Sequence, residues 1–332
     1  MKKVTIHDIA RKAGVSIGAV SRALQNDSRI SEKTRKKVHA VVKRMGYLPN
    51  SIGKGLRTGK SYLIGYLVSR VEDSFYNEIL QGIGQTVCEK GYGLITGITE
   101  NNPESEKAQI RLFLSKNIDG LIVSNYHPKT APLLKKLHKE GMPLVLCDAD
   151  PLFPIPHVAI DEKEAARLIC NHLISLGHKN YAYCFEKNPN SLVRFHLCAE
   201  VLQSHHLPPP ALYRSFSDLD QGLENKAVQP TALICYSDMI AIAVIHHLRH
   251  KGFSVPGDIS VTGFDDLFFA SWPSCQLTTI FQPKTDMGKY AAEMLFRIME
   301  EENVTSLSLP PRLVIRKSTG ENRTPVTPFT NQ

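Results

Sequence analysis

Strand-like apolar runs alternate with helical stretches along most of this chain, from about residue 61 onward. Such alternation predicts βαβ units, in which helices cover both faces of a parallel sheet. A body of about 270 residues is too large for one such core, so we expect two lobes. The expected strands are Tyr62–Val68, Tyr92–Ile98, Gly120–Ser124, Pro143–Cys147, Tyr181–Phe185, Ala232–Cys235 and Ile259–Gly263. The expected helices lie near 75–90, 104–116, 130–140, 162–176, 193–205, 237–251 and 284–301.

Basic residues are concentrated ahead of this body. Residues 1–60 contain 15 Lys or Arg and three acidic residues, a formal charge of +12, although the whole chain of 332 residues carries only +8. The remainder is therefore faintly acidic. A concentrated positive field on a folded segment is typical of a protein that binds a polyanion. A solvated basic tail has the same charge, so the pattern inside the segment must decide between the two.

Three short helices are predicted in this basic segment. Thr5 is the expected N-cap of the first helix, which Gly14 ends. Ser16 is the N-cap expected for the second, and Ser31 precedes a third that stops at Gly46. Two helices separated by about three residues around a glycine, with a third in support, form a helix-turn-helix. The second helix of such a unit enters the major groove of DNA.

The outward residues of the second helix are the candidates for contact with base edges. An arginine can offer a two-pronged donor to guanine, and an isoleucine can contact the methyl group of thymine. Hydroxyls and backbone N–H groups at helix starts suit phosphates, although capping alone also explains a serine there. The predicted DNA-binding residues of the head are Thr5, Ser16, Ile17, Gly18, Ser21, Arg22, Arg29, Ser31 and Thr34.

Several runs in this segment resemble the DNA-binding head of the lactose-repressor (LacI/GalR) family of bacterial transcription regulators. They are Val4-Thr5-Ile6-His7-Asp8-Ile9-Ala10, Ala13-Gly14-Val15-Ser16, Val20-Ser21-Arg22, Ser31-Glu32-Lys33-Thr34-Arg35 and Gly46-Tyr47-Leu48-Pro49-Asn50. The resemblance implies a helix-turn-helix domain over 1–49 and a hinge over 50–60. It also implies that Leu56 enters the minor groove as an apolar wedge and that Arg57 follows the groove.

The resemblance extends over the body to about residue 319. It rests on runs such as Ile118-Asp119-Gly120-Leu121-Ile122, His172-Leu173-Ile174-Ser175-Leu176-Gly177-His178 and Gly263-Phe264-Asp265-Asp266. The implied fold is a small all-α helix-turn-helix head plus an α/β two-lobed periplasmic-binding-protein-like sensor. The implied effector-binding domain covers 61–319 and crosses three times between an N-lobe and a C-lobe. The N-lobe is about 61–160 and 284–311, the C-lobe is about 161–283 and 312–319, and 320–332 form a flexible tail.

Polar and aromatic side chains at strand ends are the candidates for binding a hydroxyl-rich effector in this sensor. Matching of family positions favours Arg194 and Asp265, a donor and an acceptor that together suit adjacent hydroxyls. Core packing is the alternative for Phe75 and Phe216, and a surface ion pair is the alternative for Arg194. Ser237 departs from the asparagine usual in the family, so the sugar cannot be named. The full predicted set is Ser69, Phe75, Tyr76, Asp148, Arg194, Phe216, Ser237 and Asp265.

Other classes of site find little support in the sequence. The seven cysteines are widely spaced, which excludes CxxC motifs. Gly59-Lys60-Ser61 lacks the glycine spacing of a phosphate-binding loop, and His246 and His250 lack a third metal ligand. We therefore expect no metal and no cofactor. No apolar run approaches the roughly 20 residues needed to cross a membrane, and no apolar core follows the basic start, so we expect a cytoplasmic protein without membrane contact.

Three functions remain open. The first is a repressor of a carbohydrate-utilisation operon that a small sugar-type effector releases from near-palindromic double-stranded operator DNA. The second is a regulator whose DNA binding is tightened by a corepressor or a phosphorylated carrier protein. The third, from another class, is a sugar-binding or sugar-transforming α/β protein that carries a basic arm. We expect a homodimer, because twofold operators are read by twofold dimers and the tail lacks the leucine heptads with which some family members form tetramers. We do not expect an enzyme, because the sequence has no GxSxG motif and a hydrolase would leave the basic head unexplained.

Overall fold

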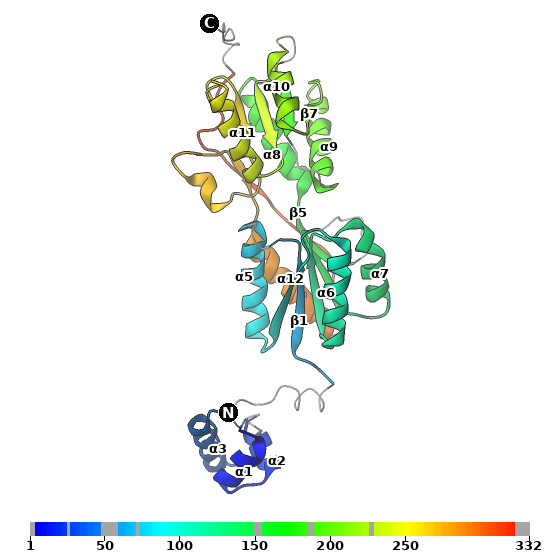
Figure 1. Ribbon diagram of the computed structural model, residues 1–332, viewed down its shortest axis with the longest axis vertical. Helices are drawn as coiled ribbons and strands as arrows, with labels where there is room; N and C mark the ends of the chain where they lie inside the picture. Colours follow the sequence, from blue (N-terminus) through cyan, green and yellow to red (C-terminus); the bar gives the residue numbers. More distant parts are fainter. Residues whose placement is uncertain are drawn as a thin grey trace. The chain divides into compact units, whose positions relative to one another are not determined.

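The computed structural model describes residues 4–24, 27–47, 59–70, 74–148, 155–184, 189–225 and 229–322. The chain divides into two compact units, Met1–Tyr62 and Leu63–Gln332. The first unit is the helical head, and the second contains both lobes of the α/β body (Figure 1).

The head consists of α1 (Ile6–Ala13), α2 (Ile17–Leu24) and α3 (Glu32–Met45). Its core is made where the apolar stripes of the three helices meet, and Ile9, Val20 and Val38 are fully buried there. Gly14 and Gly46 end α1 and α3 in the left-handed conformation, with φ of 61° and 59°. A glycine adopts this conformation without the cost that a Cβ would impose. All three helices begin where the sequence predicts, and α1 and α3 also end there.

The N-lobe is built on a six-stranded parallel sheet in the order β11-β5-β4-β3-β1-β2. Its strands are β1 (Leu63–Val68), β2 (Gly93–Ile98), β3 (Gly120–Ser124), β4 (Leu144–Cys147), β5 (His157–Ile160) and β11 (Leu307–Leu309). Its helices are α5 (Ser74–Glu89), α6 (Pro103–Ser115), α7 (Ala131–Lys139) and α12 (Lys284–Met299), with a 3-10 turn at Pro128–Thr130.

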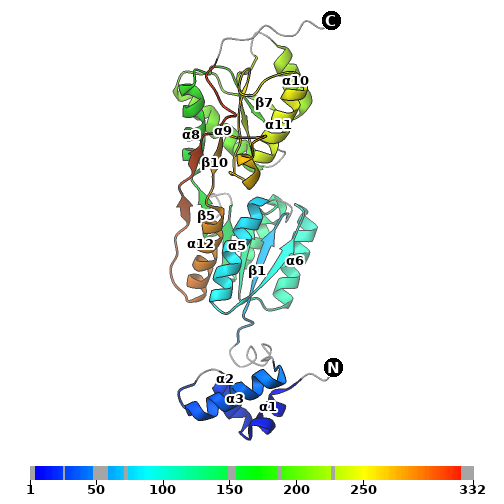
Figure 2. The ribbon, with the colours of Figure 1, turned by 90° about the vertical axis from the view of Figure 1, so that its left-hand side faces the viewer.

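Helices cover both faces of this sheet. Leu67 of β1 packs in the cluster that contains Phe113 of α6 and Leu137 of α7. Its strand neighbour Tyr66 points to the other cluster, with α5 and α12. Figure 2 shows α5 and α12 lying side by side.

Glycine makes the close approach of α5 and α12 possible. A Cβ on Gly82 of α5 would collide with the carbonyl oxygen of Thr285, and a Cβ on Gly288 of α12 would collide with the carbonyl oxygen of Ile79. The two helices therefore pack backbone to backbone, which fixes the start of α12 against the N-lobe.

The C-lobe has a four-stranded parallel sheet in the order β7-β6-β8-β9. The strands are β6 (Tyr181–Cys184), β7 (Ala211–Tyr213), β8 (Ala232–Cys235) and β9 (Ser260–Thr262). The helices are α8 (Glu162–Ser175), α9 (Pro189–Ser204), α10 (Phe216–Glu224) and α11 (Asp238–His250), with a 3-10 turn, η2, at Phe268–Ser271. Buried residues of α8 and α9 pack on one face of the sheet, and those of α10 and α11 pack on the other.

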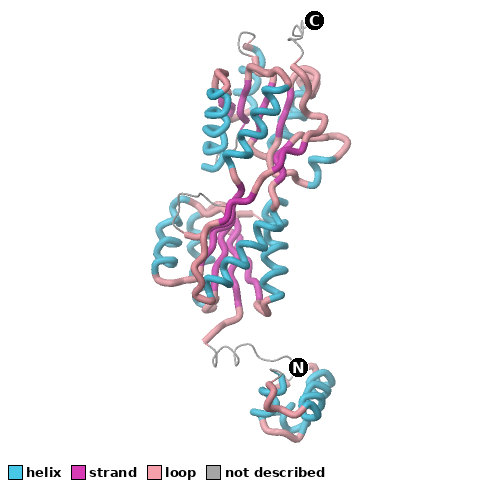
Figure 3. Tube along the Cα trace, turned by 180° about the vertical axis from the view of Figure 1, so that it is seen from behind, coloured by secondary structure: helices cyan, strands magenta, loops and turns pink. Residues whose placement is uncertain are grey.

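The chain passes between the two lobes at three places. It leaves the N-lobe after β5 to begin α8, and returns from β10 (Thr279–Phe281) into α12. It leaves again from β11 into β12 (Arg312–Val314), which pairs antiparallel with β10. Figure 3 shows strands running from one lobe toward the other at this junction.

Residues 320–322, which the sequence assigns to the tail, are attached to the C-lobe. The Gly320 N–H donates to the Ser260 hydroxyl at 3.0 Å, and the Asn322 N–H donates to the Leu176 carbonyl at 2.8 Å. The remainder of the predicted tail lies outside the described residues. Among the described helices, none is long and apolar enough to span a bilayer.

Glu106 is a buried carboxyl in the first turn of α6, only 1% exposed. Its Oε2 accepts the backbone N–H of His127 at 3.0 Å. Burial raises the pKa of Glu106 from 4.5 to about 7, against the opposing effect of this hydrogen bond and of Thr130. The folded protein therefore binds this proton more tightly than the unfolded chain does.

We expect Glu106 to make the protein less stable as pH rises. The stabilising effect of the neutral carboxyl is present below pH 4.5 and is lost as pH approaches 7. Glu106→Gln keeps a neutral group and should remove this loss. The free energy of unfolding of the variant, compared with that of wild type, should therefore rise by about 3 kcal/mol between pH 4 and pH 8. Urea unfolding of both proteins at the two pH values measures the difference. Equal pH dependence would contradict the assignment.

Candidate functional site

The outer face of α2 presents the side chains that the sequence selects for contact with bases. Ile17 is 41% exposed, and Gly18 and Arg22 are also exposed. Val20 and Ala23, on the opposite face, are fully buried in the head. The short helix is therefore held by its inner face, while the Arg22 guanidinium and the Ile17 side chain point outward. This is the arrangement that readout of a DNA groove requires.

Hydroxyl side chains cap the three helices of the head. Thr5 accepts the backbone N–H of Asp8, and the Asp8 carboxylate accepts that of Thr5 at 3.0 Å. Ser16 accepts the N–H of Ala19 at 3.1 Å, and Ser31 accepts that of Thr34 at 3.3 Å. These caps place exposed helix N-termini, which carry partial positive charge, on the surface of the head. Phosphate contact by these hydroxyls stays a prediction.

Arg29 is engaged within the head. Its Nε and Nη2 donate to the two oxygens of Asp27 at 3.0 and 2.7 Å. This hydrogen-bonded cation holds the pKa of the Asp27 carboxyl well below its usual range. The Arg29 side chain is still 77% exposed. The pair ties Arg29 to Asp27 ahead of α3, so Arg29 has a structural role beside its predicted DNA contact. Leu56 and Arg57 lie outside the described residues.

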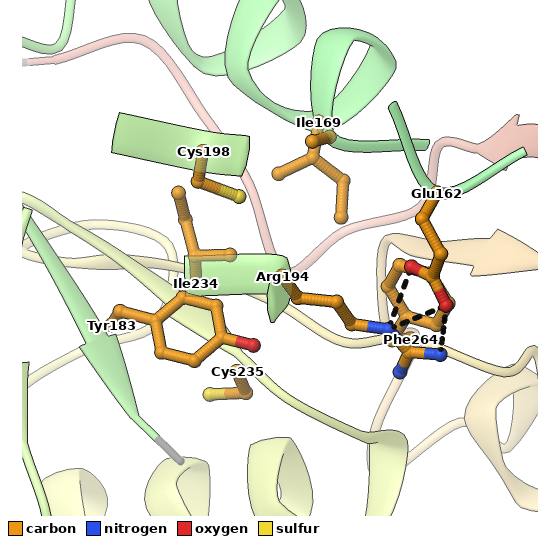
Figure 4. A pocket seen from close by; sticks show the side chains of 9 residues that line it. Glu162, Ile169, Tyr183, Arg194, Cys198, Ile234, Cys235 and Phe264 are labelled. Atoms are coloured by element: carbon orange, nitrogen blue, oxygen red, sulfur yellow. Dashed lines mark hydrogen bonds and ion pairs between the residues drawn. The ribbon is translucent and has the colours of Figure 1, made fainter. Parts of the chain in front are cut away.

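A second group of polar residues gathers in the C-lobe, at the edge where its parallel strands end. Arg194 of α9 is 6% exposed, and its guanidinium donates to both carboxylate oxygens of Glu162 at 2.8–3.1 Å. It also donates to the Tyr236 carbonyl at 3.1 Å, and its Cζ lies 3.6 Å from the centre of the Phe264 ring. Figure 4 shows the Glu162 carboxylate facing the guanidinium over this ring. Open α/β sheets bind ligands at this edge.

The space around Arg194 is small. It encloses a cavity of 10 Å³, about the room for one water molecule. A sugar ring does not fit there without movement of side chains. The lining residues are Glu162, Ala166, Ile169, Tyr183, Arg194, Cys198, Ile234, Cys235 and Phe264.

Asp265 lies at the same edge, just after β9, and is 8% exposed. Its Oδ1 accepts the side-chain amide of Gln282 at 2.7 Å, and its carbonyl accepts the Lys284 ammonium at 2.6 Å. The amide oxygen of Gln282, Oε1, is buried and accepts no hydrogen bond from the part of the chain that the structure describes. An unmet buried acceptor is costly unless water or a ligand donates to it. A ligand hydroxyl could serve here.

The remaining predicted effector residues divide between core and surface. Ser69 follows β1 and Asp148 follows β4, at the carboxyl edge of the N-lobe sheet. Phe75 and Tyr76, in the first turn of α5, are 5% and 9% exposed, and their rings meet edge to face at 5.1 Å. Both rings belong to the buried cluster that also contains Phe264 of the C-lobe. Core packing therefore accounts for their present positions.

Phe216 is not brought to this edge. It is 46% exposed and stacks on the ring of His247, with 4.6 Å between ring centres. Ser237 caps the start of α11 by accepting the N–H of Ile240, but His247 lies ten residues further, about 15 Å along the helix. The structure therefore does not bring Phe216 beside Arg194 and Asp265, because it stacks the start of α10 on the C-terminal half of α11. The role of Phe216 as a cover for the ligand, which rests on matching of family positions, stays a prediction.

Glu162, Gln282 and Lys284 were not predicted from the sequence. Glu162 carried only the signal of an acid in the first turn of a helix, which the helix dipole already explains. Gln282 and Lys284 lie at a crossing between the lobes, and their burial, at 1% and 2% exposed, is visible only in the structure.

Comparison with protein families divides the chain into three matches. Residues 5–50 match the family described as bacterial regulatory proteins, lacI family. Residues 61–198 match the periplasmic binding proteins and sugar binding domain of LacI family, and residues 170–319 match a periplasmic binding protein-like domain.

Full-length relatives give the same picture. Catabolite control protein A of Priestia megaterium is 32% identical over 330 residues, which cover 95% of this chain and 99% of the relative. The transcriptional repressor CytR of Escherichia coli strain K12 is 31% identical over 330 residues, 95% of this chain and 96% of CytR. The lac repressor dimer bound to operator and the anti-inducer ONPF superimposes with a TM-score of 0.85 at 28% identity, covering 96% of this chain and all of the repressor chain (100%).

Proposed function

Because the chain belongs to the LacI family of bacterial regulatory proteins, we propose that it represses a carbohydrate-utilisation operon and is released from operator DNA by a small sugar-type effector. One observation carries the proposal. A helix-turn-helix head with an exposed second helix precedes a two-lobed body whose polar residues gather at a strand edge of the C-lobe. The relatives are regulators rather than enzymes, and we extend this to the chain, which works in the cytoplasm where its DNA is.

The head supplies the DNA contacts. Its positive charge attracts the phosphate backbone without regard to sequence, and the outer face of α2 supplies the sequence preference. Arg22 is the residue suited to guanine, and Ile17 suits a thymine methyl. Thr5, Ser16, Ser31 and Thr34 place helix starts against phosphates.

The effector acts through the C-lobe edge. Asp265 and the Gln282 amide offer acceptors, and the backbone and hydroxyl groups near Ser237 add further polar atoms. A ligand rich in hydroxyls can satisfy these groups. The effector releases operator only if it binds the non-operator conformation more tightly, and a preference of about 5.5 kcal/mol moves a 1:99 population to 99:1.

A homodimer reads the near-palindromic operator, and the C-lobe offers a surface through which two subunits can associate. Phe268 is 63% exposed and Trp272 is 51% exposed, with ring centres 5.6 Å apart. Met239, in the first turn of α11, is 59% exposed. The neighbouring Asp238 accepts the N–H of Leu267, just before η2, at 2.7 Å and so holds the start of α11 beside η2. Exposed apolar groups of this size mark interaction sites. The lac repressor structure is a dimer on operator, and a twofold contact of these aromatic residues fits that symmetry.

A phosphorylated carrier protein as co-signal has less support. Such a partner requires exposed cations, and the helix considered for it, α12, carries Lys289 and Arg297. Lys289 lies 4.0 Å from Glu293, and Arg297 lies 2.8 Å from Glu302. Both cations are therefore already partnered by nearby carboxylates.

Replacement of Arg22 tests the DNA contact. We expect Arg22→Ala to weaken binding to the preferred operator about 5- to 150-fold, because a two-pronged arginine contact discriminates a base by roughly 1–3 kcal/mol. Binding to nonspecific duplex should fall much less. Fluorescence anisotropy at fixed salt measures both.

Arg44→Ala is the matched control, because it removes an exposed cation from the last turn of α3 without touching α2. Equal losses for the two variants on both DNAs would favour a merely basic arm over sequence readout.

Replacement of Trp272 tests the dimer surface. A charge at the centre of an apolar contact is costly to bury, so Trp272→Glu should shift the protein toward monomer and weaken operator binding at least tenfold. Sedimentation velocity and anisotropy measure the two effects. A variant that stays as dimeric as wild type would place the dimer contact elsewhere.

A thermal-shift panel of sugars, followed by operator titration with each hit, tests the effector. We expect a hit to lower operator affinity, and Asp265→Asn to reduce the affinity for that sugar about tenfold, because a carboxylate accepts a hydroxyl proton more strongly than an amide does. A hit that tightens operator binding instead would make the chain a corepressor-dependent regulator.

A further inference from the structure

All three nitrogens of the Arg194 guanidinium donate hydrogen bonds within the chain. Nε and Nη2 both donate to Glu162, and Nη1 donates to the Tyr236 carbonyl. The Phe264 ring covers one face of the group. The guanidinium is the best anion receptor that this edge of the C-lobe offers. The protein's own carboxylate sits where the carboxylate or phosphate of a ligand would bind.

The backbone fixes Glu162 in this position. It is the first residue of α8, directly after the chain leaves the N-lobe, and Asp161 caps the helix by accepting the N–H of Glu164 at 3.0 Å. Capping is thus done by the neighbour, and the Glu162 side chain turns to α9 instead. Side-chain exposure is 28% for Glu162 and 8% for Arg194, so the pair is largely withdrawn from water. A paired charge is strongly preferred to a lone one at such burial.

Carboxylates lie beside the buried and half-buried cations near this edge. The Asp265 carboxylate acts electrostatically on Arg194, and Asp238 is a further buried acid. Arg194 is paired with Glu162 at 2.8 Å, Arg316 with Asp266 at 2.7 Å and Lys284 with Glu78 at 3.5 Å. An anionic ligand that approached these three cations would meet positive charge that a carboxylate already offsets.

We propose that Glu162 is a specificity-determining residue of the effector site, which closes Arg194 to anions and restricts the site to neutral, hydroxyl-rich ligands. Sugar phosphates and sugar acids are excluded because they would have to displace a two-pronged internal carboxylate. Neutral sugars need only the acceptors of Asp265 and Gln282. This inference deepens the proposed function and rests on its placement of the effector at this edge.

The test is anion binding by the full-length protein. Inorganic phosphate and glucose 6-phosphate are titrated into wild type, Glu162→Gln and Glu162→Ala, with thermal shift and calorimetry as readouts. We expect both variants to bind phosphate at least tenfold more tightly than wild type, a change of about 1.4 kcal/mol. A second change, Arg194→Gln, should remove the gain, which separates this site from anion binding by the basic head.

Glu164→Gln is the matched control. It makes the same change two residues along α8 and releases Arg167, whose side chain is 55% exposed. We expect no tighter phosphate binding, because a solvated guanidinium holds an anion weakly. If the Glu162 variants are destabilised by the unpaired arginine, phosphate should restore their melting temperature more than it raises that of wild type.

Two results would overturn the proposal. The first is that wild type binds glucose 6-phosphate as tightly as the Glu162 variants do and loses this binding on Arg194→Gln. Glu162 would then move aside for the anion and would not exclude it. The other is variants that neither bind phosphate nor regain stability in it. Operator binding and neutral-sugar binding are measured separately. If the repressor proposal fails, the phosphate titrations therefore still show whether Glu162 excludes anions.

Discussion

The arrangement of the two lobes depends on one buried ammonium group. Lys284 begins α12 in the N-lobe, is 2% exposed, and donates to the carbonyls of Asp265 and Asp266 in the C-lobe at 2.6 and 3.3 Å. Glu78 of α5 lies 3.5 Å from it. A buried cation is tolerated only where such partners surround it, so the lobes cannot separate at this point without leaving the charge unmet. The glycine contact between α5 and α12 then transmits this position to the helices of the N-lobe.

The candidate effector site is built on the same junction. Gln282 donates to Asp265 from a position two residues before Lys284, and Glu162 follows another crossing between the lobes. A ligand that donates a hydrogen bond to either group acts directly on the segments that join the lobes. This gives a physical route by which ligand binding biases the relative position of the two lobes, because a shift of equilibrium requires contacts that differ between the states.

Local signals predicted the elements well, whereas long-range contacts escaped them. The caps Thr5 and Ser31 and the glycines at 14 and 46 set the helix ends of the head, and these act within four residues. Short strands such as β7, β10, β11 and β12 are too short to show the alternation of apolar and polar residues that identifies a strand in a sequence. The partner of Arg194 is 32 residues away, so nothing near the arginine in the sequence indicates the carboxylate that closes it. The position of Phe216 also depends on a long-range contact, because its ring stacks on His247, 31 residues away in the sequence.

The uneven distribution of charge along the chain gives the Arg194–Glu162 pair a role in keeping anions away from the C-lobe. Residues 1–60 contain 15 of the 40 basic residues. Such a concentration of positive charge is what a segment that binds the phosphates of DNA requires. A sensor that also offered an unpaired arginine would compete for the same phosphate groups and for the many phosphorylated solutes that accompany them. Pairing of Arg194 inside the C-lobe keeps the guanidinium available for packing on Phe264 while its charge is cancelled. The chain thereby confines its response to anions to the head and leaves the C-lobe to discriminate by hydroxyl pattern.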